Sequence, residues 1–145
     1  LKVRLLAERE QGSPLGEGKG NMNKILLVDD NSTMRQILKL YMMGKLHTFL
    51  EADSADRACE ILANEQVDLL IVDIHLGKID GVSFVRALRE QNPSTKDIPA
   101  VFISGDREGG QALSSLEGQS TFLLKPLDRE RLVQVVDSLL PRKAG

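Results

Sequence analysis

The chain has 145 residues, of which 41% are hydrophobic and 3% aromatic, and its 19 Lys plus Arg against 21 Asp plus Glu give a net charge of −2. This composition excludes wholesale disorder and predicts one globular domain with a sizeable core, and the near balance of charge argues against direct binding of nucleic acid. The longest apolar runs have four residues, far short of the roughly 18 that a membrane span needs, so no membrane insertion is expected. Cys59 is the single cysteine, which excludes an internal disulfide and favours a reducing, cytoplasmic location.

The first 21 residues differ in composition from the rest of the chain. Six residues between 12 and 20 are Gly, Ser or Pro, and they follow a short, poorly patterned segment, residues 1–10. We interpret residues 1–21 as a leader or flexible linker and residues 22–145 as the domain. Two origins stay open for the leader, an extension upstream of a natural start at Met22 or a tail from a preceding domain.

From Lys24 onward, short apolar runs alternate five times with segments of helical periodicity, which is typical of βαβ units around a parallel sheet. Three of the runs are solidly apolar, as expected of strands covered on both faces. The expected strands are residues 24–28, 46–50, 68–72, 100–103 and 121–124.

A helix is expected after each strand. The segment 107–116 is the weakest of the five, because Gly109 and Gly110 each cost a helix about 1 kcal/mol relative to Ala. The expected boundaries of the others are Gly44 as the end of the first, Ser54 as the start of the second, Asp80-Gly81 and Asn92-Pro93 around the third, and Pro141 after the last.

Polar residues follow four of the five predicted strands. In chain order they are Asp29 and Asp30, then Asp73, then Ser104 and Gly105, then Lys125 and Pro126. Strand-to-helix loops of a parallel sheet lie at one edge, and ligands bind there. If the first and third strands are neighbours, Asp29, Asp30 and Asp73 share one small volume.

Three carboxylates so close together repel one another by several kcal/mol, so the cluster needs a cation or a raised pKa. Carboxylate oxygens suit Mg²⁺, and Lys125 could supply a second positive charge. A carboxylate beside a metal ion, a lysine and the hydroxyl of Ser104 is a plausible phosphoryl acceptor. Each acid alone could be a helix cap, but all four strand ends together favour a site.

At this point the chain resembles the receiver domain of two-component response regulators, from Asn23 to about Leu140. Residues 24–31, with Asp29 and Asp30, resemble the first strand and acidic pair of that family. Asp73 resembles its phosphoacceptor, Ser104 its hydroxyl switch residue, and Lys125-Pro126 its lysine and commonly cis proline. The resemblance implies a flavodoxin-like α/β fold, a (βα)5 three-layer sandwich with parallel strand order 2-1-3-4-5.

The resemblance also implies a function. Asp73 would accept a phosphoryl group from a histidine kinase or a histidine phosphotransfer protein, with Mg²⁺ held by Asp29, Asp30, Asp73 and the backbone carbonyl of His75. Ser104, Lys125 and the backbone of Gly105 would contact the phosphoryl group. The protein would be a regulatory phosphoacceptor rather than an enzyme, with at most self-phosphorylation from small donors and autodephosphorylation.

The output implied by the resemblance is a change in one face of the domain. The fourth helix, fifth strand and fifth helix would shift, with Ser104 and Phe122 as switch residues, although Phe122 could equally be a plain core residue. The shifted face would bind a downstream protein effector and could also pair two copies of the chain. Gly77 stands where the family commonly has Pro and Gly105 where it usually has Ala, so we expect a looser loop at Gly77.

Several other classes of protein compete with this interpretation. A haloacid-dehalogenase-like phosphatase has a second Asp two residues after its nucleophile, whereas His75 and Asn31 stand at those places here. A phosphate-binding P-loop fails because the glycines near Lys19 precede the first strand. A receiver excised from a hybrid histidine kinase, a stand-alone regulator and a constitutive pseudo-receiver that only binds partners stay open.

Overall fold

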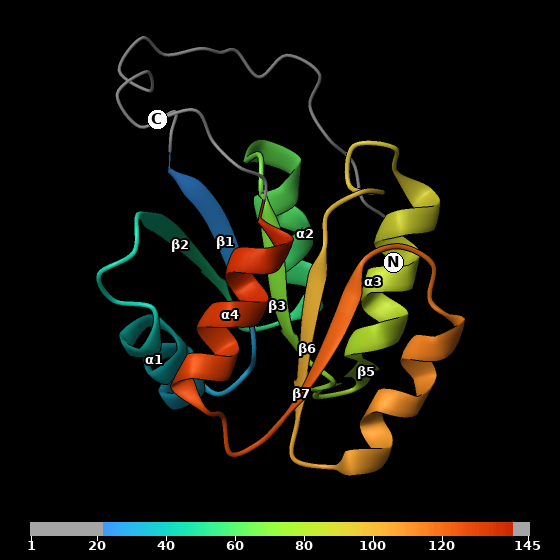
Figure 1. Ribbon diagram of the computed structural model, residues 1–145. Helices are drawn as coiled ribbons and strands as arrows, with labels where there is room; N and C mark the ends of the chain where they lie inside the picture. Colours follow the sequence, from blue (N-terminus) through green and yellow to red (C-terminus); the bar gives the residue numbers. More distant parts are fainter. Residues whose placement is uncertain (1–21, 141–145) are drawn as a thin grey trace, which may run out of the picture.

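A central five-stranded sheet with helices on both faces forms the domain (Figure 1). The computed structural model describes residues 22–140, so the predicted leader and the predicted helix stop at Pro141 lie outside the described residues. All neighbouring strands of this sheet run parallel, in the order β2-β1-β3-β6-β7. Its strands are β1 (Asn23–Val28), β2 (His47–Ala52), β3 (Leu69–Asp73), β6 (Ala100–Ser104) and β7 (Ser120–Leu124).

This order is the predicted 2-1-3-4-5, because β4 (His75–Leu76) and β5 (Ile79–Asp80) form a separate antiparallel hairpin. The hairpin was not predicted, because two-residue strands carry no alternation of apolar and polar residues to detect. Gly77 has a φ of 65° and is the first of the two turn residues, and a type II′ hairpin turn requires a positive φ at that position. Glycine therefore serves a defined turn here.

The second strand lies further along the chain than predicted, at His47–Ala52 instead of residues 46–50. Leu46 is 73% exposed and belongs to the turn after the first helix. The strand extends to Ala52 because the carbonyl of Ala52 still accepts a hydrogen bond, at 3.0 Å, from the backbone N–H of Asp29. This bond carries β2 up to the edge of the sheet where the acidic residues lie.

A polar side chain caps the start of each of the four α-helices, and the predicted starts at Ser54 and at Asp80-Gly81 are confirmed. The helices are α1 (Ser32–Tyr41), α2 (Ala55–Asn64), α3 (Gly81–Gln91) and α4 (Arg129–Leu139). The capping side chains, which accept a hydrogen bond from a backbone N–H of the first turn, belong to Asn31, Ser54, Asp80 and Asp128.

The fourth expected helix is a 3-10 helix, η2 (Arg107–Ser115), with no buried residue. The segment was predicted to be the weakest of the five helices, and this finding agrees with that prediction. The expectation of a fifth α-helix was wrong, because the segment is a 3-10 helix. Gly110 lies so close to the ring of Phe122 that an added Cβ would come within 3.0 Å of it. The glycines that weaken the helix thus let the segment pack closely against β7.

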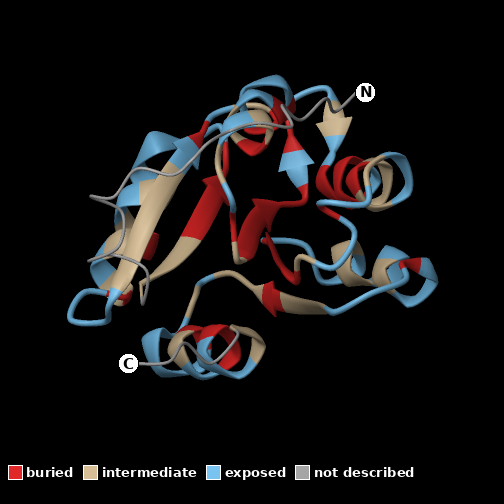
Figure 2. Ribbon diagram, turned by 90° about the horizontal axis from the view of Figure 1, so that it is seen from above, coloured by how far each residue is buried: buried red, intermediate tan, exposed pale blue. Residues whose placement is uncertain are grey.

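Alternate residues of the middle strands face opposite sides of the sheet, and each side has its own hydrophobic cluster. One cluster joins the strands to α2, α3 and Leu116 after η2, and the other joins them to α1 and α4. In β3, for example, Leu70 and Val72 belong to the first cluster, and Leu69 and Ile71 belong to the second. Figure 2 shows the buried residues concentrated in the middle strands and on the helix sides that face them.

Candidate phosphoacceptor and metal site

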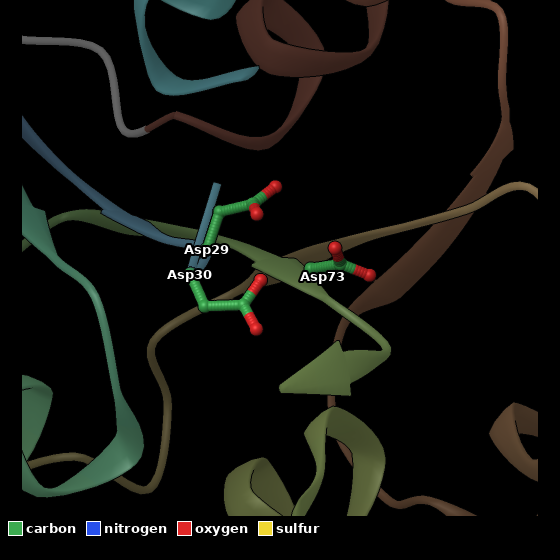
Figure 3. A group of neighbouring side chains, drawn as sticks. All are labelled: Asp29, Asp30 and Asp73. Atoms are coloured by element: carbon green, nitrogen blue, oxygen red, sulfur yellow. The ribbon is translucent and has the colours of Figure 1, made fainter. Parts of the chain in front are cut away.

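Asp29, Asp30 and Asp73 lie together where β1 and β3 end (Figure 3). Their nearest carboxylate oxygens all lie within 4.8 Å of one another. The cause is the parallel pairing of β1 with β3, in which Val28 is the register partner of Val72, so that the residues after both lie side by side. The predicted meeting of these three acids is thus confirmed.

Asp29 is the most deeply buried of the three, with 2% of its surface exposed. Its Oδ1 accepts a hydrogen bond from the backbone N–H of Asn31 at 2.9 Å. Burial raises the pKa of Asp29 to about 6, the Asn31 hydrogen bond opposes that rise, and the negative charges of Asp73 and Asp30 add to it. The fold therefore holds a carboxylate that gains from a cation beside it.

Asp73 is the last residue of β3 and is 7% exposed. Its Oδ1 accepts a hydrogen bond from the backbone N–H of His75 at 2.9 Å, and its Oδ2 lies 3.6 Å from Nζ of Lys125. Lys125 follows β7, and its backbone N–H donates to the carbonyl of Ser104 at 2.8 Å. The bond between Lys125 and Pro126 is cis, as the resemblance implied.

Ser104 ends β6 and is fully buried beside this cluster. Its Oγ accepts a hydrogen bond from the backbone N–H of Asp106 at 3.0 Å. Gly105 is exposed, and a Cβ added there would meet nothing within 4 Å. The loop after β6 therefore leaves open space next to a buried hydroxyl.

The two remaining predicted site residues are His75, which follows β3 by two positions, and Phe122, which lies in the middle of β7. The side chain of His75 is exposed, while its backbone N–H contacts Asp73. Phe122 lies in β7, is half-buried and packs against the core on the side of α2 and α3. Its ring also contacts Gly110 of η2.

Sequence reasoning missed two residues that support the acidic cluster. Gly81 starts α3 so close to β3 that an added Cβ would lie 2.3 Å from the carbonyl oxygen of Asp73. Arg35 of α1 donates a hydrogen bond to the carbonyl oxygen of Asp29. A cation near a helix N-terminus is electrostatically unfavourable without an anionic partner, and that signal could have drawn attention to Arg35.

The donor set fits a hard divalent cation, since three carboxylates of which two are buried face one lysine ammonium within ion-pair distance of Asp73. Mg²⁺ prefers such carboxylate oxygens. The same edge offers a buried hydroxyl and a lysine beside the carboxylate of Asp73, a combination suited to stabilising negative charge on a transferred phosphoryl group.

No helix among residues 22–140 combines the length and the apolar character that crossing a bilayer would require.

Comparison with known proteins identifies the family. Residues 25–137 match the model of the response regulator receiver domain. The chain is 36% identical over 132 residues to the regulatory protein VirG of Agrobacterium tumefaciens, covering 88% of this chain and 45% of VirG. It is 27% identical over 140 residues to the CAI-1 autoinducer sensor kinase/phosphatase CqsS of Vibrio cholerae, covering 92% of this chain and 20% of CqsS.

Solved structures agree with the fold. The signal receiver domain of an HD domain-containing protein from Pseudomonas fluorescens has a TM-score of 0.72 at 28% identity, covering 83% of this chain and 88% of that one. The chemotaxis response regulator CheY4 of Vibrio cholerae has a TM-score of 0.69 at 24% identity, covering 82% and 99%. The chain spans about half the length of VirG and a fifth of CqsS. With a family match over most of its length and a flavodoxin-like fold, the chain belongs to the response regulator receiver domains of two-component signalling.

Proposed function

We propose that Asp73 is the phosphoacceptor of this receiver domain. A carboxylate oxygen of Asp73 attacks the phosphorus of a phosphohistidine, a new O–P bond forms, the P–N bond breaks, and the histidine leaves with its electron pair. The single observation that carries the proposal is the position of Asp73, buried at the end of β3, within 4.8 Å of two further carboxylates and 3.6 Å from Lys125.

Asp29, Asp30, Asp73 and the backbone carbonyl of His75 would hold Mg²⁺. When bound, the ion offsets negative charge on the phosphoryl oxygens. Lys125 would supply a second positive charge next to Asp73, and the ion pair between them at 3.6 Å supports that role. The backbone N–H of His75 orients the Asp73 carboxylate through its hydrogen bond to Oδ1.

Ser104 and the backbone of Gly105 would contact the transferred group. The hydroxyl of Ser104 already accepts a bond from Asp106, the residue whose side chain caps η2 by accepting from the N–H of Glu108 at 3.0 Å. A phosphoryl group that drew Ser104 toward itself would therefore pull on the start of η2. Phe122, packed on Gly110 of η2, would follow that movement.

The partners follow from this chemistry. A histidine kinase or histidine phosphotransfer protein donates the phosphoryl group, and a downstream protein binds the face formed by η2, β7 and α4, where two copies of the chain could also pair. The domain acts as a regulator whose own chemistry is limited to self-phosphorylation and autodephosphorylation. The matches to a regulatory protein and to a sensor kinase/phosphatase favour neither a stand-alone regulator nor a receiver from a hybrid kinase.

Incubation with phosphoramidate, followed by intact mass spectrometry, tests the proposal. Wild-type protein should gain the mass of one phosphoryl group with Mg²⁺ and none in EDTA. Asp73→Asn should gain none, whereas the control Asp53→Asn, at an exposed position after β2, should behave as wild type. An unmodified wild-type protein at saturating Mg²⁺ would overturn the proposal and favour a constitutive interaction module.

A further inference from the structure

The peptide group between Asp29 and Asp30 is bound by an arginine from α1. Nη1 of Arg35 donates a hydrogen bond to the carbonyl oxygen of Asp29 at 2.5 Å. The backbone N–H of Asp29 is bound to Ala52, and Oδ1 of Asp29 accepts from Asn31. These three bonds hold the backbone and Oδ1 of Asp29 in place. Oδ2 of Asp29 takes part in none of the three.

Arg35 is itself held by a glutamate of β2. Its Nε donates to Oε1 of Glu51 at 2.8 Å, and the side chains of Arg35 and Glu51 are 15% and 35% exposed. Lys39, one turn further along α1, contacts the other carboxylate oxygen of Glu51 at 2.6 Å. The hydrogen bonds from Lys39 and Arg35 lower the pKa of Glu51, so the anion persists at neutral pH. One guanidinium thus joins α1, β2 and the loop that carries both acids.

We propose that Arg35, anchored by Glu51, is a positioning residue that sets the affinity of the acidic cluster for its divalent cation. This inference rests on the proposed function, in which Asp29 and Asp30 hold Mg²⁺. The two acids are adjacent, so rotation of the single peptide between them would redirect both side chains. Nη1 of Arg35 binds the carbonyl of that peptide while Nε of the same rigid plane binds Glu51, so the guanidinium restricts the rotation in a way that a lysine ammonium cannot.

The direction of the effect distinguishes positioning from simple electrostatics. Arg35 is a cation near the cluster, so its charge alone repels Mg²⁺, and removing the charge would tighten binding. Loss of positioning would weaken binding, as removal of residues that orient metal ligands does. The sign of the change in affinity therefore decides between the two effects.

Isothermal titration calorimetry with Mg²⁺ on wild-type protein, Arg35→Met and Lys39→Met provides the measurement. Arg35→Met should weaken Mg²⁺ binding roughly tenfold or more. Lys39→Met is the matched control, since it also removes a cation bound to Glu51 but leaves the bond from Arg35 to Asp29 intact. Its Mg²⁺ affinity should equal or exceed that of wild type. Arg35→Lys should recover only part of the loss, because one ammonium replaces the two-point contact.

Each outcome has a separate meaning. Failure of wild-type protein to bind Mg²⁺ would overturn the proposed function itself. If wild type binds and Arg35→Met binds as tightly or more tightly, or if Lys39→Met weakens binding equally, only the positioning role is overturned. Should Arg35→Met fail to fold, Glu51→Gln takes its place, with weaker Mg²⁺ binding supporting the role and unchanged binding contradicting it.

Discussion

Asp29 is the most deeply buried acid of the cluster, and the negative charges of Asp73 and Asp30 lie close to it. An acid whose pKa is higher in the folded protein binds its proton more tightly there than in the unfolded chain. The proton-linked stabilisation is therefore complete below the ordinary pKa of 3.8 and is lost as the pH rises through about 6. Without metal, the protein at neutral pH carries a buried negative charge that costs it stability.

Asp29→Asn should relieve that cost. Measured by urea unfolding in EDTA, the variant should exceed wild type in unfolding free energy by up to about 3 kcal/mol above pH 6, and the difference should vanish near pH 4. Asn keeps an oxygen that can accept the N–H of Asn31. Asp53→Asn, at an exposed position, serves as the control with no such pH dependence. Equal stability of Asp29→Asn and wild type at pH 8 would contradict this account.

Gly81 and Gly105 provide a matched pair for steric tests. Neither glycine has a positive φ, so backbone strain does not distinguish them, whereas the space for a Cβ does. Gly81→Ala would press a methyl group against the carbonyl of Asp73 at 2.3 Å, whereas Gly105→Ala meets nothing within 4 Å. We expect Gly81→Ala to lower the unfolding free energy by about 3 kcal/mol and Gly105→Ala to change it by less than about 0.5 kcal/mol. Equal urea midpoints for the two variants would refute the close approach of α3 to β3.

At the scale of the elements, α3 is tied to the beginnings of β6 and β7 by one side chain. Arg89 donates to the carbonyls of Glu117, Ile98 and Gln119 at 2.7, 2.9 and 2.7 Å. It also donates to Oγ of Ser120 at 3.1 Å. Burial lowers the pKa of this guanidinium, but an arginine stays protonated throughout the neutral range. These contacts lie at the end of the sheet opposite the acidic cluster.

Arg89→Met should therefore destabilise the domain without affecting phosphorylation. Removing this charged donor leaves three carbonyls and the Ser120 hydroxyl without its hydrogen bonds, which should cost about 2 kcal/mol of unfolding free energy as measured by urea denaturation. Arg86→Met, which loses one bond to the exposed Ser115, should cost less than about 1 kcal/mol and is the control. A phosphorylation rate at Asp73 that falls in Arg89→Met while the protein is fully folded would show that the two ends of the sheet are coupled.

At the scale of the whole molecule, the parallel sheet converts distant sequence positions into one site. Asp73 and Ser104 end β3 and β6, whereas Asp29 and Lys125 directly follow β1 and β7. The strand order β2-β1-β3-β6-β7 sets these four strands side by side. Crossovers with helices on both faces bring every strand to the same edge in the same direction. The net charge of −2 is a sum over the whole chain, so it does not reveal that three carboxylates and a lysine gather at one edge of the sheet.

Much of the fold was predictable because the signals are local. The apolar runs of β1, β3 and β6 and the capping residues Ser54 and Asp80 mark their elements without any knowledge of the rest of the chain. The end of β2, the 3-10 geometry of η2 and the β4–β5 hairpin were not predictable in the same way. The first two depend on contacts between residues far apart in the chain, the bond between Asp29 and Ala52 and the packing of Gly110 on Phe122. The hairpin is local, but its two-residue strands are too short to show a pattern.

The sequence by itself determined that polar groups follow four strands of a parallel α/β domain, because strand ends and residue types are properties of short segments. Only the tertiary structure decided that Asp29 is buried with a raised pKa, that Lys125 lies 3.6 Å from Asp73, and that Arg35 bonds both to the carbonyl of Asp29 and to Glu51. Burial, ion-pair distance and second-layer hydrogen bonds arise from the packing of segments far apart in the chain, and no local pattern encodes them.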